Sequence, residues 1–100
     1  MVSDTQKQFR EDQDTLLLTE ESLIWQLVVW NDEVNTFDWV IESLVEICGH
    51  TYEQAEQCAL FIHHKGKYTV KHGELDELRA MCEALLDRGI TATVEEMAKV

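Results

Sequence analysis

The sequence predicts a small α+β domain with three short strands and three helices in the order β-α-α-β-α-β. Two observations indicate this class. Three segments carry apolar residues at helical spacing and begin or end at capping residues. Three others are rich in Val and Trp, or alternate apolar and polar residues, as strands do. We expect a three-stranded sheet packed against three helices that lie on one of its faces. Periodicity does not predict the order of the strands.

Length and composition indicate one domain. One hundred residues, 45% of them hydrophobic, suit a single compact core. Residues 1–21 are polar and lack periodicity apart from Leu16–Leu18, so we expect a flexible N-terminal extension. Residues 22–100 form the predicted core domain.

The first strand is predicted over Leu23–Trp30, and both of its faces are largely apolar, which is typical of a central strand. A loop over residues 31–35 follows. Thr36 is a suitable N-cap for a helix that ends at Gly49. The buried stripe of that helix is Val40, Ile41, Leu44, Val45 and Cys48.

Thr51 opens a second helix, because Thr51 and Gln54 match a capping box. Its stripe is Ala55, Cys58, Ala59 and Ile62, and the helix is expected to end near His63–His64. A second strand follows over Lys65–Lys71, and Gly73 is expected to break it. The third helix ends at Gly89, and the last strand is expected over Ile90–Val94. The stripe of this third helix is Leu75, Leu78, Met81, Cys82 and Leu85.

The charge balance limits the partners. Twenty acidic and eight basic residues give a formal net charge of −12, which repels phosphate backbones and makes a nucleic-acid partner unexpected. Such a surface attracts a cationic ligand or a basic protein patch, although acidity can also serve solubility alone. No apolar run approaches the length of a membrane span, and the N-terminus does not resemble a secretory signal. Three widely spaced cysteines fit reduced thiols, so we expect a cytoplasmic protein.

Polar residues follow the first strand abruptly. Asn31, Asp32 and Glu33 stand directly after the apolar run, where polar groups at the rim of a core often form small binding sites. A second polar signal, His63-x-x-Gly66-Lys67, follows the second helix.

Together these motifs resemble the ClpS adaptor family. The likeness runs through WQLVVWNDEVNTFDWVIESL and AEQCALFIHHKGKYTV and covers roughly residues 23–96. The resemblance implies an adaptor without enzymatic activity that needs no cofactor or metal. Such adaptors bind proteins by a free N-terminal Leu, Phe, Tyr or Trp. They deliver these proteins to the N-terminal domain of a Clp-type AAA+ unfoldase. We expect a monomer.

The resemblance also implies roles for particular residues. Asn31, Asp32 and His63 would bind the α-amino group, which needs acceptors and a negative charge. Glu33 and Asn35 would lie at the rim, against the ligand backbone. Glu74 and Arg79 would contact the unfoldase. The hydrophobic pocket would be formed by Val29, Phe37, Val40, Ala59, Ile62 and Ile90.

Some positions depart from the family pattern. Glu33 stands where many members have Asp, Asn35 where Thr is common, and Arg79 where Lys is usual. Phe37 and Ala59 both stand where Met is common, at the pocket mouth and at its depth. We therefore expect a shifted or broadened preference for the N-terminal residue.

Other interpretations remain open at this stage. The apolar pocket residues, Ile90 in particular, can be ordinary core, and Glu74 and Arg79 can belong to a solvated helix face. Cys58, His63 and His64 lack any usual zinc spacing. An enzyme would need an activated nucleophile or a phosphate loop, and neither signature is present. The other alternative is an acidic protein–protein interaction module of ribosomal-stalk type that does not bind N-terminal residues.

Overall fold

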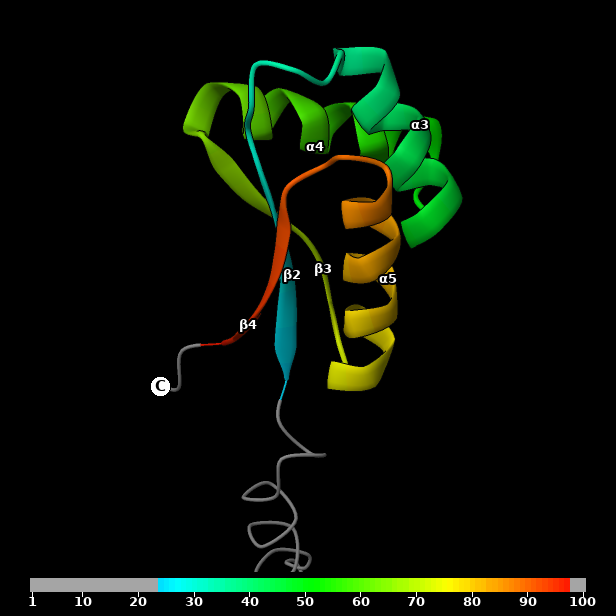
Figure 1. Cartoon of the computed structure of the whole chain (residues 1–100), viewed down its shortest axis with the longest axis vertical. Coiled ribbons are helices and arrows are strands. Elements are labelled where there is room, and N and C mark those ends of the chain that lie inside the picture. The colour runs from blue at the N-terminus through cyan, green and yellow to red at the C-terminus, as the bar shows by residue number, and fades with distance from the viewer. Residues whose placement is uncertain (1–23, 98–100) are drawn as a thin grey trace, which may run out of the picture.

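The structure, a computed structural model, describes residues 24–97; the expected N-terminal extension over residues 1–21 lies outside them. The elements follow the predicted order (Figure 1). They are β2 (Trp25–Trp30), α3 (Phe37–Cys48), α4 (Tyr52–Lys65), β3 (Lys67–Gly73), α5 (Leu75–Asp87) and β4 (Ala92–Glu96). The predicted α+β class is confirmed.

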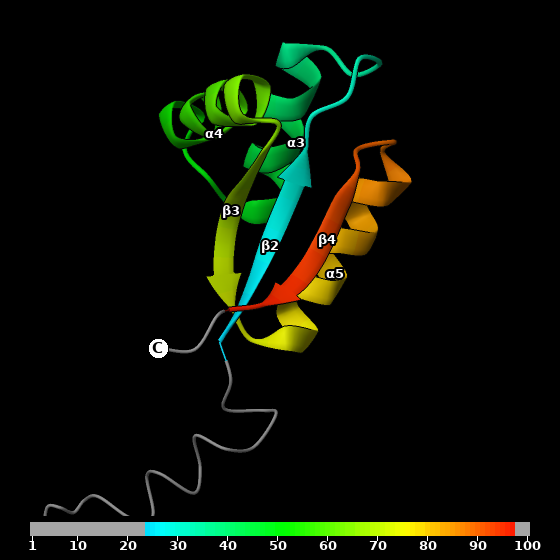
Figure 2. The same ribbon diagram turned by 90° about the vertical axis from the view of Figure 1, so that its left-hand side faces the viewer.

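The three strands form one antiparallel sheet in the order β3-β2-β4. β2 is central, as its two apolar faces predicted. Leu27 and Val29 are almost fully buried in the main core cluster. Figure 1 shows α3 and α5 on the same side of the sheet and α4 crossing its upper end, while Figure 2 views the open face.

The predicted caps of α3 and α4 are confirmed. Thr36 accepts a hydrogen bond from the Trp39 amide, and Thr51 and Gln54 form a reciprocal capping box. Gly49 ends α3 in the left-handed conformation at φ 75°, where a side chain would be strained. Local sequence therefore determines where both helices begin and where α3 ends.

Several predicted boundaries were wrong. α4 continues to Lys65, so β3 begins at Lys67 rather than Lys65, and it runs through Gly73, which does not break it. The last strand begins at Ala92. Ile90 instead closes the end of α5, because its amide donates to the Leu85 carbonyl at 3.0 Å. Pairing with β2 decides the ends of both strands, and periodicity within a segment carries no information on such pairing.

The end of β2 is held between two turns. The Asn31 amide donates to the Gly66 carbonyl at 2.8 Å, and the Trp30 amide donates to the Thr91 carbonyl at 2.9 Å. These bonds fix the start of the polar loop between the α4–β3 turn and the α5–β4 turn. Within residues 24–97, no helix is both long and apolar enough to cross a membrane.

Candidate functional site

A pocket of about 240 Å³ lies where β2 ends, between the polar loop, the start of α3 and the last turns of α4. Its lining joins residues far apart in the sequence. They are Asn31, Asp32, Glu33, Asn35, Thr36, Phe37, Val40, Ala59, Ile62 and His63. Pockets for drug-sized ligands usually have roughly 300–1,000 Å³, so this one suits a single side chain with its attached polar group.

The apolar part of the pocket comes from two helices. Ala59 and Ile62 face it from α4, and both are nearly fully buried in the core. Val40 contributes from α3, and Phe37, at the start of the same helix, remains 39% exposed. The pocket therefore has a buried apolar floor and one exposed aromatic side chain.

Asp32 organises the polar loop. Its Oδ1 accepts hydrogen bonds from the amides of Val34 and Asn35, both at 2.8 Å, and its Oδ2 accepts one from Asn35 Nδ2 at 2.8 Å. The hydrogen bond from the Asn35 amide is the main reason why the pKa of Asp32 lies below its ordinary value. A carboxylate has about four lone-pair positions, so the ionised group keeps one for a further donor.

Asn35 joins this loop to a distant turn. Besides donating to Asp32, its Nδ2 donates to the Gly89 carbonyl at 2.8 Å. Both amide protons are thus engaged within the protein, and both acceptors are oxygens, which determines the orientation of the amide. The remaining polar atom is Oδ1, so Asn35 can offer a ligand an acceptor but no donor.

His63 and Asn31 approach the pocket from different elements. The hydrogen bond of its backbone amide holds Asn31 at the end of β2, and His63 lies in the last turn of α4. Neither side chain has a hydrogen bond to another part of residues 24–97. His64 is not among the lining residues and packs edge-on against His63, with ring centres 5.3 Å apart.

The other residues singled out in the sequence lie elsewhere. Val29 and Ile90 are 1% and 2% exposed and belong to the core cluster rather than to the pocket lining. Glu74, the N-cap of α5, makes no side-chain capping bond, and Arg79 is exposed further along that helix. The structure does not bring Glu74 or Arg79 to the pocket.

Sequence reasoning missed a second connection behind the polar loop. Trp39 Nε1 donates to the Arg88 carbonyl at 3.1 Å, and the Arg88 guanidinium lies over the Trp39 ring at 5.3 Å. Arg88 also forms an ion pair with Glu46 at 2.7 Å and donates to buried Ser43. Nothing in the local sequence of either segment indicates these contacts, since the partners lie more than forty residues apart.

Neither the histidines nor the cysteines form a metal centre in the part of the chain that the structure describes. Cys48, Cys58 and Cys82 are free thiols. Burial raises the pKa of all three and brings that of Cys48 to about 11, so they remain protonated near neutral pH. Packing as small apolar side chains, rather than reactivity, accounts for them.

Comparison with known proteins identifies the family. The model of the family described as ATP-dependent Clp protease adaptor protein ClpS matches residues 20–93. The chain belongs to the ClpS family. It is therefore an adaptor of the Clp protease.

Named relatives agree with this assignment. ClpS of Corynebacterium diphtheriae is 29% identical over 86% of this chain and 76% of its own length. ClpS of Corynebacterium aurimucosum is 31% identical over 78% of this chain and 70% of its own length. Among solved structures, Agrobacterium tumefaciens ClpS2 bound to L-phenylalaninamide has a TM-score of 0.70 at 17% identity. The structural match covers 75% of this chain and 98% of the A. tumefaciens chain, which shows the ClpS fold.

Proposed function

We propose that this ClpS protein captures substrate proteins by a free N-terminal hydrophobic residue, with Leu, Phe, Tyr and Trp as the main candidates. It then delivers them to the N-terminal domain of a Clp AAA+ unfoldase. In this proposal it acts as a cytoplasmic monomer and catalyses no reaction. Asn31, Asp32 and His63 receive the α-amino group, and the apolar floor receives the side chain.

One observation carries the proposal: the number of acceptors at the pocket matches the number of donors on the ligand. An α-ammonium group has three N–H donors and a positive charge. Asp32 keeps one acceptor position and a negative charge, while Asn31 and His63 contact no other described side chain through hydrogen bonds. Asn35 adds an acceptor toward the ligand backbone because both its donors are already engaged.

The energies suit reversible capture. Burial of a Leu or Phe side chain contributes about 1.5–3 kcal/mol. A hydrogen bond to a charged group contributes about 1.5–3 kcal/mol before the entropy lost on binding. Micromolar or somewhat tighter affinity follows from these terms. L-Phenylalaninamide, the ligand of A. tumefaciens ClpS2, combines a free α-amino group with an aromatic side chain, which supports the same ligand chemistry here.

The decisive experiment compares free and acetylated N-termini. Fluorescein-labelled peptides that begin with Leu or Phe should bind, and N-acetylated versions should not, because acetylation removes the charge and two of the three donors. An acidic interaction module without a terminus pocket would bind both forms alike or neither. Hydrolysis or other turnover of the peptide would instead indicate an enzyme.

The range of accepted residues tests the two departures in the pocket. Ala59 makes a short floor where a longer side chain would fill space, and Phe37 adds bulk at the mouth. We expect affinities for peptides beginning with Ile or Val to approach those for Leu and Phe. Ala59→Met should lower the affinity for peptides beginning with Ile or Val and restore a Leu, Phe, Tyr and Trp profile, whereas that strict profile in the wild-type protein would contradict a widened pocket.

Delivery to the unfoldase rests on a different surface. Glu74 and Arg79 lie at the start of α5, away from the pocket, so ligand and unfoldase can be bound together. Arg79→Glu should weaken binding to the isolated N-terminal domain of the unfoldase and leave peptide affinity unchanged. Unchanged binding to this domain would place the contact elsewhere.

A further inference from the structure

A second hollow of about 400 Å³ lies between α3 and the start of α4, outside the pocket for the N-terminal residue. Its lining residues are Asp38, Ile41, Glu42, Val45, Glu46 and Tyr52. We call this hollow the acidic groove. It shares no lining residue with the pocket, although both include residues from the first turns of α3.

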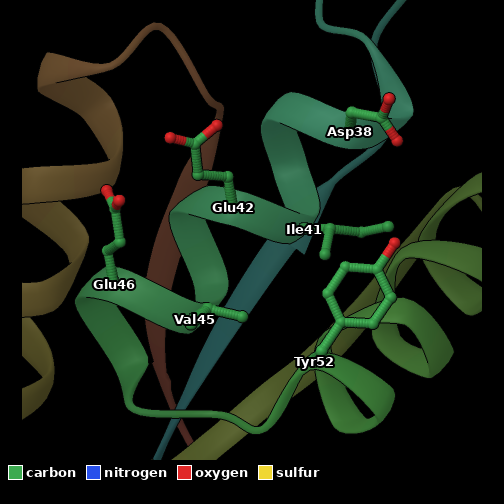
Figure 3. A pocket seen from close by; sticks show the side chains of 6 residues that line it. All are labelled: Asp38, Ile41, Glu42, Val45, Glu46 and Tyr52. Carbon is green, nitrogen blue, oxygen red and sulfur yellow. The ribbon is translucent and has the colours of Figure 1, made fainter.

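The floor of the acidic groove is apolar. Figure 3 shows Ile41 and Val45 pointing from α3 toward the ring of Tyr52, which stands at the start of α4. Tyr52 is 58% exposed, although an aromatic ring of this size usually packs more deeply. The groove thus offers the Tyr52 ring and the half-buried Val45 side chain to an apolar group from outside, while Ile41, which is 3% exposed, supports them from the core.

The border of the acidic groove is a row of carboxylates. Asp38, Glu42 and Glu46 recur every four residues, so they lie on one side of α3 and extend over about 12 Å. Figure 3 shows the carboxylates of Glu42 and Glu46 on the far side of the apolar floor from Tyr52, pointing away from the ring. Within residues 24–97, Arg88 pairs with Glu46, and no cation pairs with Asp38 or Glu42.

We propose that the acidic groove binds a basic amphipathic segment of a partner protein. That segment would place a leucine-like side chain on the floor beside Tyr52 and two Lys or Arg side chains against Asp38 and Glu42. Charge complementarity selects this occupant. A second copy of the chain would bring the same carboxylate row against itself in a symmetric dimer, and a nucleic acid would be repelled.

The proposal does not rest on capture of N-terminal residues, because the two hollows have separate linings. The probe is an N-acetylated, helical peptide of roughly 12 residues with Leu at every third or fourth position flanked by Lys, labelled at its C-terminus. Acetylation keeps it out of the pocket. A peptide with Glu in place of each Lys is the control ligand.

Matched variants separate the acidic groove from the general acidity of the chain. Asp38→Asn with Glu42→Gln removes two charges from the groove. Glu77→Gln with Glu83→Gln removes two exposed charges from α5, one of them again in the first helical turn. We expect the groove pair to weaken binding of the basic peptide roughly fivefold and the α5 pair to change it by less than twofold.

The apolar floor needs its own test. Tyr52→Ala should weaken binding of the basic peptide, and Tyr52→Phe should retain it, because the ring rather than the hydroxyl group makes the contact. In an NMR titration of the isotope-labelled protein with the basic peptide, chemical-shift changes should centre on Val45 and Tyr52. All variants should bind a free N-terminal Phe peptide within about twofold of wild type, which also shows that they fold.

Four outcomes would overturn the proposal. The peptide could fail to bind, or the α5 variants could weaken binding as much as the groove variants, which would indicate attraction by net charge alone. Spermine could displace the basic peptide completely, and Glu42→Gln could weaken spermine binding as much as it weakens peptide binding. Both results together would indicate a site for small polycations. Sedimentation could reveal a dimer that the groove variants dissociate.

Discussion

The pocket and the acidic groove are both hollows with carboxylates at the border, but the carboxylates are held in different ways. Asp32 accepts three hydrogen bonds from its own loop, and its neighbour Asn35 is tied to Gly89. Asp38 and Glu42 are exposed, and neither pairs with a cation within residues 24–97. A preorganised border directs a few acceptors at one small group, whereas a row of independent charges favours a longer, less sharply defined cationic partner.

The largest expected effect lies in the preorganised border. Asp32→Ala removes the charge, the spare acceptor and three bonds that shape the loop. We expect affinity for a free N-terminal Phe peptide to fall on the order of ten- to a hundredfold by fluorescence anisotropy. Hydrogen exchange at the Val34 and Asn35 amides should accelerate. Unchanged affinity would mean that the loop does not receive the α-amino group.

The next effect distinguishes two adjacent histidines. His63 lines the pocket and His64 does not, although they are neighbours in sequence. His63→Ala should weaken peptide binding about three- to tenfold by loss of one acceptor, and His64→Ala should leave it within twofold. The opposite result would show that α4 presents the other ring to the ligand.

Substitution of Arg88 tests how much the contacts between α3 and the end of α5 contribute to the stability of the fold. Arg88→Ala removes the ion pair with Glu46, the bond to Ser43 and the contact with the Trp39 ring. We expect the free energy of unfolding in urea to fall by about 1 kcal/mol, since the ion pair is partly exposed. Arg79→Ala, on the exposed part of the same helix, serves as control and should change it by less than about 0.5 kcal/mol.

Acid should destabilise the fold in two steps. Burial is the main cause that lowers the pKa of His50, so the unfolded chain binds a proton there more readily than the folded one. Stability should therefore decline as the pH falls below about 6.5, the ordinary value for histidine. A second decline should begin near pH 4, the ordinary value for Asp, because the unfolded chain then binds a proton at Asp32 while the hydrogen bonds of the folded chain keep this carboxylate ionised to lower pH.

Urea unfolding of the wild-type protein and His50→Gln between pH 8 and pH 3 measures both steps. The variant should lose the first decline and keep the second. A variant whose stability follows the wild-type curve throughout would exclude His50 as the source of the first step.

The smallest effect belongs to the acidic groove in the absence of a partner. Glu42 stands one helical turn from both Asp38 and Glu46, so like charges repel along this side of α3. Glu42→Gln should leave stability unchanged or raise it by a few tenths of a kcal/mol in thermal unfolding. A clear loss of stability would indicate that this carboxylate serves the fold rather than an outside ligand.

Much of the local structure could be predicted from the sequence. Thr36, Thr51 with Gln54, and Gly49 act on backbone groups within a few residues, so their capping roles are legible in the chain and the structure confirms them. The apolar faces of β2 likewise indicated a central strand before any partner was known. Such features depend on short-range sterics and hydrogen bonding.

The sequence by itself determined which elements form, their order and the family resemblance that singles out Asn31, Asp32 and His63. Only the tertiary structure decided that Asn35 is tied to Gly89 and Trp39 to Arg88, and that Ile90 lies in the core beside α5 rather than in β4. The physical reason is the distance along the sequence over which each kind of interaction acts. Caps and periodic stripes are local, whereas these contacts require β2 to be paired and α5 to be packed before their partners meet.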